Sequence, residues 1–260
     1  MSIDPVKVWL EQRGSNEASL LRLRLARPKA NVLDAAMIHS LAAALDAHRG
    51  NHGLLAVLVD HEGPHFSFGA SVEEHLPARC AEMLAGFHGL LCRMLEWPKP
   101  ILVCAKGQCL GGGLELAAAG SLLFVAPETR LGQPEIRLGV IAPAASVLLP
   151  MRIGQGRAED LLYSGRSIDG ATALAWGLAA GLADDPVAAA LAYFEEQLSA
   201  RSAASLACAV RAARQPLADL VRARLEDVES LYLETVMATR DANEGLAAFI
   251  EKRQPRWEHR

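Results

Sequence analysis

Three consecutive glycines, Gly111 to Gly113, constrain this chain more than any other feature of its sequence. They follow a short apolar segment, residues 101–104, that is typical of a buried strand, and they precede an apolar run, residues 114–119, that is typical of a helix. Consecutive glycines are conformationally costly, so they indicate positive φ angles or a close approach of the backbone. Amides at the start of a helix have no intrahelical acceptor and can donate to an anion or oxyanion. We therefore expect a strand, a glycine turn and a helix that together form part of a binding site.

Glu115 lies about one turn inside that predicted helix. A carboxylate at this position could be a surface group that offsets the helix dipole. Its neighbours Leu114 and Leu116, with the alanines that follow, make the helix too apolar to lie in water. Buried carboxylates often have raised pKa values and often take part in catalysis. Both interpretations of Glu115 stay open on this segment alone.

Two further segments are weak signals when taken singly. Glu135 follows Glu115 by twenty residues, in a short turn bounded by Pro134 and Gly139, where it could simply pair with Arg137. The loop at residues 66–71 is apolar and closes on a Gly-Ala pair, so it could lend a backbone N–H to a site or merely pack.

The hydrophobic pattern of the remaining chain predicts an α/β fold. Alternation at residues 6–10 and 21–25 predicts half-buried strands, and the continuous apolar run at 54–59 predicts a strand covered on both faces. After about residue 154 the pattern is almost entirely helical. We expect a core over residues 1–190 and a helical C-terminal region over residues 191–260. More locally, we expect a helix capped by Asp34, a long helix over 83–95, a turn over 107–113, a strand over 122–125 and a last helix capped by Asp241.

Taken together, the motifs resemble the crotonase superfamily, and specifically its enoyl-CoA hydratases. The order F-x-x-G-A at residue 66, G-G-G-x-E at residue 111 and P-E-x-x-L-G at residue 134 carries the likeness, which extends over residues 26–253. The resemblance implies a spiral of β-β-α turns with a helical C-terminal trimerisation region, assembled as a homotrimer or homohexamer.

The resemblance also implies roles for individual residues. The backbone N–H groups of Ala70 and Gly112 would form an oxyanion hole for a thioester oxygen. Glu115 and Glu135 match the two hydratase glutamates, which hold a water between them and act as base and acid. Two neighbouring carboxyls cannot both ionise cheaply, so they divide naturally into those two roles.

Coenzyme A would enter as part of the substrate thioester, so no separate cofactor is expected. By resemblance, Lys29, Ala30 and Phe68 lie near the adenine pocket, and Phe249 and Lys252 reach the coenzyme of a neighbouring subunit. A solvated surface cation is the alternative interpretation of both lysines, and the helix dipole would favour Lys252 in that role.

The sequence departs from ordinary hydratases in two places. Pro143, Ala145 and Ser146 replace glycines, which adds side-chain volume near the acyl group and a hydroxyl at Ser146. Residues 71–77 also differ from the usual pattern. Both departures resemble the cyclohexa-1,5-diene-1-carbonyl-CoA hydratases of anaerobic benzoyl-CoA breakdown, which form 6-hydroxycyclohex-1-ene-1-carbonyl-CoA.

Bulk properties exclude several other functions. A formal net charge of −4 offers no general attraction to nucleic acid, and no apolar run approaches the roughly 20 residues of a membrane helix. Asp4 and Pro5 stand where a signal peptide would have a basic region, so we expect a cytoplasmic protein. Five histidines have no metal-site spacing, and we expect them to be solvated: His48, His52, His61, His65 and His75. An ordinary short-chain enoyl-CoA hydratase and a non-catalytic scaffold of the same fold are the alternatives.

Overall fold

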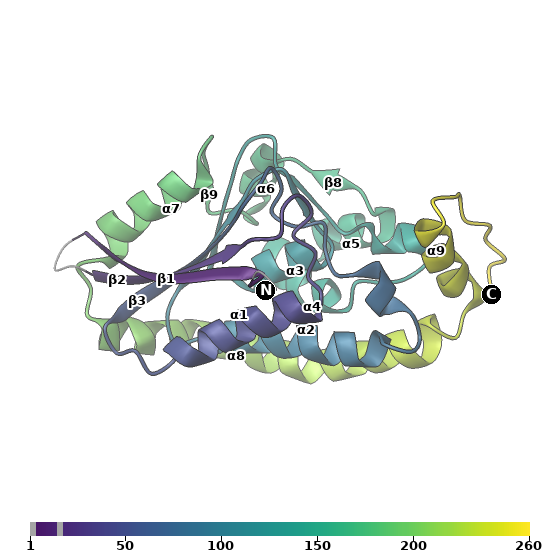
Figure 1. Ribbon diagram of the computed structural model, residues 1–260, viewed down its shortest axis with the longest axis horizontal. Coiled ribbons are helices and arrows are strands. Elements are labelled where there is room, and N and C mark those ends of the chain that lie inside the picture. The colour runs from purple at the N-terminus through teal and green to yellow at the C-terminus, as the bar shows by residue number, and fades with distance from the viewer. Residues whose placement is uncertain (1–3, 15–17) are drawn as a thin grey trace.

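A main sheet of six strands, with helices on both faces, organises the computed structural model, which describes residues 4–14 and 18–260 (Figure 1). The order across this sheet is β1-β2-β3-β4-β6-β9; β1 and β2 are antiparallel, and the remaining neighbours are parallel. A smaller sheet has the order β5-β7-β8. The strands are β1 (Val6–Arg13), β2 (Ala18–Leu25), β3 (Leu54–His61), β4 (Ile101–Ala105), β5 (Gln108–Leu110), β6 (Leu122–Val125), β7 (Arg130–Gly132), β8 (Ser167–Ile168) and β9 (Gly181–Leu182).

Helices make up most of the remaining structure and connect these strands. The α-helices are α1 (Ala35–His48), α2 (Cys80–Leu95), α3 (Gly112–Ala119), α4 (Pro143–Ile153), α5 (Gln155–Ser164), α6 (Gly170–Trp176), α7 (Pro186–Tyr193), α8 (Ala203–Ser230) and α9 (Arg240–Ile250). Shorter helical segments are η2 (Val72–His75), η3 (Pro134–Leu138), η4 (Phe194–Leu198) and η5 (Leu231–Val236).

Side chains of the central strands alternate between two apolar layers. On one face Leu21, Val57 and Val103 join the main core beneath α1, α2, α3 and α4. On the other face Leu58 and Leu102 pack against α7 and η4. The predicted α/β fold is therefore confirmed.

Several local predictions are also confirmed. Asp34 caps α1 by accepting a hydrogen bond from the backbone N–H of Met37 at 2.9 Å. The predicted strands at 54–59 and 122–125 and the long helix at 83–95 lie within β3, β6 and α2.

Three predictions were wrong in detail. The turn expected over 107–113 contains β5, because its backbone pairs with β7 in the smaller sheet. Thr239, rather than Asp241, caps the last helix by accepting from Ala242 N, and the Asp241 carboxylate instead accepts from the backbone of the C-terminal segment. Strand β2 is buried on both faces, not half-buried, because α7 and η4 cover its second face.

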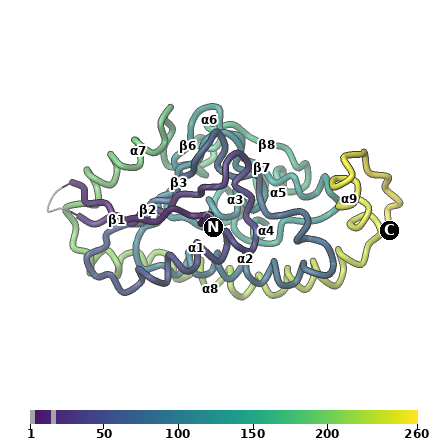
Figure 2. The backbone as a smooth tube through the Cα atoms, in the orientation of Figure 1, coloured from purple at the N-terminus to yellow at the C-terminus, as the bar shows by residue number. Residues whose placement is uncertain are grey.

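The C-terminal region is helical, as expected, and runs along the core. Helix α8 contacts α2 and α4, and its Val221 and Leu225 belong to the main core (Figure 1). Helix α9 and the C-terminus lie together at one end of the molecule (Figure 2). A trimerisation role for residues 191–260 stays a prediction. Across residues 4–14 and 18–260, no helix combines the length and the apolar character needed to cross a membrane.

Candidate active site

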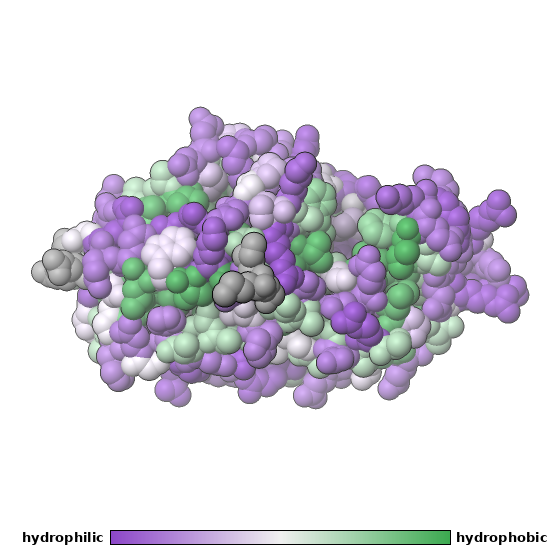
Figure 3. All heavy atoms as spheres, in the orientation of Figure 1, coloured by the Kyte–Doolittle hydropathy of each residue, from purple (hydrophilic) through white to green (hydrophobic). Residues whose placement is uncertain are grey.

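A cavity of about 380 Å³ lies between α2, α3, η3, the first turn of α4, and α9. Phe68 and Phe249 line it although they are 46% and 54% exposed, so both stand where it meets solvent. On the face drawn in Figure 3, apolar atoms gather beside α9. All four residues predicted to be catalytic line this cavity: Ala70, Gly112, Glu115 and Glu135.

The glycine turn is built as the sequence indicated. Gly111 has φ of +52°, a conformation that side chains disfavour, and its N–H donates to the Gly132 carbonyl at 2.9 Å. A Cβ on Gly111 would lie 2.5 Å from Oε1 of Glu135. Glycine is therefore required here both for the backbone conformation and for the close approach of the carboxyl group.

The amides of Ala70 and Gly112 lie close together at the cavity wall. A Cβ on Gly112 would be 3.0 Å from the Ala70 nitrogen and 3.4 Å from the Phe87 ring. Within the part of the chain that the structure describes, neither N–H donates to a backbone or side-chain acceptor. Two adjacent free N–H groups can stabilise negative charge on a substrate oxygen.

Glu115 is held at the junction of two helices. It lies in the first turn of α3, is 5% exposed, and its Oε1 accepts from the Ala145 N–H at 2.7 Å, at the start of α4. Burial raises the pKa of Glu115, while the charge of His88 and the amides of Ala145 and Ala144 act in the opposite direction. The pKa of Glu115 is therefore raised less than it would be if the carboxyl were buried without these groups.

Glu135 lies in the first turn of η3, immediately after Pro134. The cavity leaves it partly accessible, but burial of its carboxyl and then the charge of Glu115 raise its pKa to about 8. The buried Gln133 amide reaches both of its oxygens, at 3.1 and 3.0 Å when the nitrogen faces them. With the amide turned over, its oxygen can instead accept the proton of a neutral carboxyl.

Both carboxyls therefore have raised pKa values, and ionisation of Glu115 opposes ionisation of Glu135, so the pair does not readily carry two charges near neutral pH. Among the described residues, Glu135 forms no ion pair with Arg137, which was the structural alternative. Nor does any group of three or more metal-ligating side chains in the described part of the chain form a metal site.

The residues predicted to contact coenzyme A fall into two groups. Phe68 and Phe249 line the cavity of their own chain, and the Phe68 N–H donates to the Ala30 carbonyl at 3.0 Å. Lys29 and Lys252 are exposed and lie outside the cavity lining. Their role in coenzyme binding stays a prediction.

The three residues that replace glycines of ordinary hydratases, Pro143, Ala145 and Ser146, have different contacts in the structure. Pro143 lines the cavity, as expected. Ala145 contributes its backbone N–H to Glu115, and the Ser146 hydroxyl donates to the Ala142 carbonyl at 2.7 Å. The expectation that Ser146 brings a hydroxyl to the acyl pocket was therefore wrong, because α4 turns that group onto its own backbone.

Sequence reasoning missed two histidines of the cavity. His75 was expected to be solvated, but it lines the cavity and burial lowers its pKa. Burial also lowers the pKa of His61. His88, 4% exposed on α2, lines the cavity beside Glu115. It was overlooked because an isolated histidine within an apolar helical pattern carries no local signal of function.

Comparisons with known proteins agree with this geometry. The family model for enoyl-CoA hydratase/isomerase matches residues 15–260. A cyclohexa-1,5-dienecarbonyl-CoA hydratase from Thauera aromatica is 61% identical over 98% of both chains. A probable enoyl-CoA hydratase from Bacillus subtilis is 32% identical, over 90% of this chain and 93% of the relative. The crystal structure of carnitinyl-CoA hydratase from Mycobacterium avium superposes over the full length of both chains with a TM-score of 0.84 and 27% identity.

Proposed function

The chain belongs to the enoyl-CoA hydratase/isomerase family, and we propose that it is a hydro-lyase that adds water to cyclohexa-1,5-diene-1-carbonyl-CoA. The product is 6-hydroxycyclohex-1-ene-1-carbonyl-CoA. Identity of 61% over 98% of both chains to a hydratase of this name supports the choice of substrate. Coenzyme A arrives as part of the substrate, so the reaction consumes only water and needs no separate cofactor.

The observation that carries the proposal is the pairing of two carboxyls, of which Glu115 is buried and Glu135 partly accessible, with two free amides in one cavity. Burial raises the pKa values of Glu115 and Glu135, and Ala70 and Gly112 offer N–H groups in the same cavity. A scaffold protein would gain nothing from burying two carboxyls without a cation. Hydration of a conjugated thioester uses both features.

The two amides act on the thioester oxygen. Addition of water at the carbon β to the carbonyl moves negative charge onto that oxygen. Fixed N–H groups of Ala70 and Gly112 stabilise this charge without reorganising, and one such donor is worth about 3 kcal/mol.

The two carboxyls act on water. Glu115, whose ionised form is supported by the Ala145 amide, takes a proton as the water oxygen attacks carbon. Glu135, neutral below its pKa of about 8, donates a hydrogen bond that holds the water in place. The enzyme then returns one proton to the far end of the diene, so that one molecule of water is added overall.

The shape of the cavity supports a ring over a chain. Pro143 lines the cavity at the position where ordinary hydratases have glycine, and Phe87 closes the wall beside Gly112. A six-membered ring is short and wide, whereas a fatty enoyl chain is long and narrow. One misfitted group changes discrimination by about 1–3 kcal/mol.

We also propose a homotrimer or homohexamer as the active form, with action in the cytoplasm. Exposed apolar side chains on the C-terminal segments support an assembly surface, with Leu231, Phe249 and Ile250 at 48%, 54% and 41% exposure.

The decisive experiment compares hydration of the cyclic dienoyl thioester with hydration of crotonyl-CoA, by loss of absorbance from the conjugated system. We expect kcat/KM to favour the ring by at least about tenfold. Pro143→Gly should narrow that preference. Equal or faster turnover of crotonyl-CoA would contradict the ring-specific proposal and favour a short-chain enoyl-CoA hydratase, the activity suggested by the Bacillus subtilis relative.

A further inference from the structure

We infer that His88 is a third catalytic group of this cavity, which gives a proton to the far carbon of the diene while the two glutamates act on water. The inference rests on the proposed cyclic dienoyl substrate. It assigns chemistry to a residue that lies outside the glycine and glutamate motifs.

His88 is fixed from the outer side of the molecule. Helix α2 contacts α8 and α3, and His88 is 4% exposed on it (Figure 1). Its Nδ1 hydrogen-bonds to Oε1 of Glu229, which lies on α8. A carboxylate partner accepts, so Nδ1 carries a proton, and this contact sets the ring orientation.

The other ring nitrogen is left for a ligand. Nε2 of His88 is buried and has no hydrogen-bond partner among the described residues. An unmet polar atom in the interior is destabilising, so a structural histidine would normally find a partner. Because Nδ1 is directed at Glu229, Nε2 is on the opposite edge of the ring, and His88 is part of the cavity lining. A substrate or water in the cavity can supply the hydrogen-bond partner that Nε2 lacks.

All three titratable groups line the same cavity. The charge of Glu115 acts on Glu135, and the charge of His88 acts on Glu115. His88 lies on α2, whereas Glu115 and Glu135 lie on α3 and η3. This arrangement separates the site of water attack from a second proton donor.

The proposed reaction needs such a separation. In a linear enoyl thioester, water and proton add to adjacent carbons. In the cyclic diene, the oxygen adds to the carbon β to the thioester, and the proton goes to the carbon opposite it across the ring. A donor grouped with the water would instead favour the nearer carbon, next to the carbonyl.

The proton balance closes with His88 as an imidazolium. Glu115 takes one proton from water as the C–O bond forms, and electrons shift through the thioester enolate. Nε2 of His88 gives its proton to the far carbon as the C–H bond forms and the remaining double bond moves into conjugation with the carbonyl. Glu115 then passes its proton to Nε2, directly or through a water, and all groups return to their starting states.

Two substitutions separate proton donation from packing. His88→Gln keeps an amide near the Nε2 position but cannot exchange a proton. Glu229→Gln keeps an acceptor for Nδ1 and removes only the negative charge of the partner. His52→Gln, at an exposed loop residue, is the control.

The test measures kcat and KM on the cyclic dienoyl thioester, and the position of deuterium in product formed in D₂O by NMR. We expect His88→Gln to lower kcat at least about a hundredfold with KM nearly unchanged, and Glu229→Gln to lower it about tenfold. Residual product from both variants should carry more deuterium at the carbon next to the carbonyl. His52→Gln should match the wild type.

Three outcomes would overturn the inference. Turnover by His88→Gln within about threefold of the wild type, with deuterium still at the far carbon, would remove His88 from the chemistry. If His88→Gln fails to fold, unchanged kcat and unchanged deuterium position in Glu229→Gln would do the same. A wild-type protein that does not hydrate the ring at all would instead refute the proposed function, and this inference with it.

Discussion

Carboxylates are buried in two regions of this molecule, and the two regions differ in whether a cation contacts the carboxylate. On the main sheet, Asp60 is 1% exposed and lies between two arginines. In the cavity, Glu115 is 5% exposed and meets a backbone amide. Both carboxylates are removed from water, but only the first is given a full opposite charge in contact.

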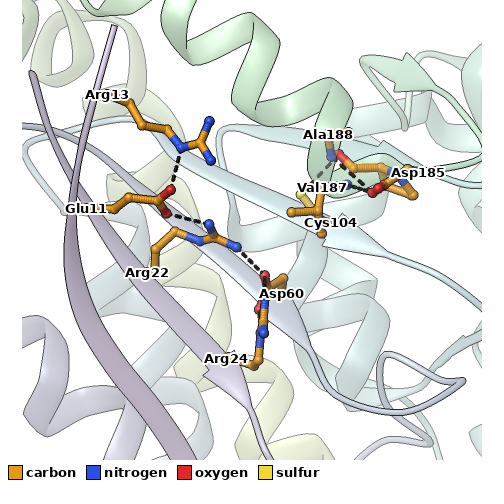
Figure 4. A network of polar contacts seen from close by, with 10 residues as sticks. Glu11, Arg13, Arg22, Arg24, Asp60, Cys104, Asp185, Val187 and Ala188 are labelled. Atoms are coloured by element: carbon orange, nitrogen blue, oxygen red, sulfur yellow. Dashed lines mark hydrogen bonds and ion pairs between the residues drawn. The ribbon is translucent and has the colours of Figure 1, made fainter.

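The sheet region is a closed ionic network across β1, β2 and β3 (Figure 4). Arg22 donates to Glu11 and to Asp60 at 2.6 Å each, and Arg24 donates to both oxygens of Asp60 at 2.6 and 2.7 Å. Trp9 lies against both arginines, with its ring centroid 5.0 and 5.2 Å away. Here each charge has a partner, so the network can serve structure without changing protonation.

The consequence appears in the pKa values. Burial alone would raise the pKa of Glu11, but hydrogen bonds from Arg13 and Arg22 lower it overall. Burial and the charge of Glu115 together raise the pKa of Glu135 to about 8. Burial therefore does not raise the pKa of a carboxyl when arginines contact it. A carboxyl that is buried without a contacting cation has a raised pKa and can exchange a proton near neutral pH.

The largest expected effect is on turnover by the cavity carboxyls. Glu115→Gln should lower kcat by about 10²- to 10⁴-fold, the usual scale for loss of a general base, and Glu135→Gln should lower it by a smaller factor, because the amide can still donate a hydrogen bond to the water. Their thermal stability should equal or exceed that of the wild type, because a buried ionisable group has been replaced by a neutral one. Near-normal turnover in either folded variant would exclude that glutamate from the mechanism.

The next effect is on stability, and it lies in the sheet. Asp60→Asn leaves Arg22 and Arg24 without their shared anion, and breaking a buried pair costs up to 3–5 kcal/mol. Because Arg22 keeps Glu11 and Arg24 is partly exposed, we expect a loss of about 2–3 kcal/mol in the free energy of unfolding.

Asp160→Asn is the matched control for that loss. Its partner Arg166 is exposed, as is Asp160 itself, so the same substitution should cost only about 0–1 kcal/mol. Denaturant unfolding measures both variants, and turnover of the folded fraction should stay normal in both. Equal losses in the two would show that burial of the sheet network contributes nothing.

A smaller effect should appear in the pH dependence of stability. Glu135 has its pKa raised from 4.5 to about 8, so between these values the native state keeps a proton that the unfolded state has lost. The free energy of unfolding should therefore fall as pH rises through this window, by on the order of 1 kcal/mol per pH unit from this group. Glu135→Gln should remove that slope, so its advantage over the wild type grows from pH 5 to pH 8. A constant difference across this range would contradict the raised pKa.

Local sequence predicted the glycines and glutamates that line the cavity better than it predicted their surroundings. The glycine turn and Glu115 lie on one short segment, so their motif could be recognised without the fold. His88 could not be recognised, because its partner Glu229 is 141 positions away and meets it only when α8 packs on α2. Burial of Arg22 was also hidden: alternation in β2 predicted an exposed position, but Arg22 is 4% exposed and contacts Glu11, Asp60 and Trp9 from the neighbouring strands.

The central claim is that Glu135 in the cavity keeps its proton at pH 7, whereas Glu11 in the sheet network is ionised. Infrared difference spectroscopy tests this claim most directly. The C=O stretch of a neutral carboxylic acid, taken as wild type minus Glu135→Gln, should be present at pH 7 and disappear as pH rises through about 8. Wild type minus Glu11→Gln should show no such band at pH 7, because the arginines lower the pKa of Glu11. A Glu135 difference spectrum with only carboxylate bands at pH 7, or a neutral-acid band from Glu11, would contradict the account.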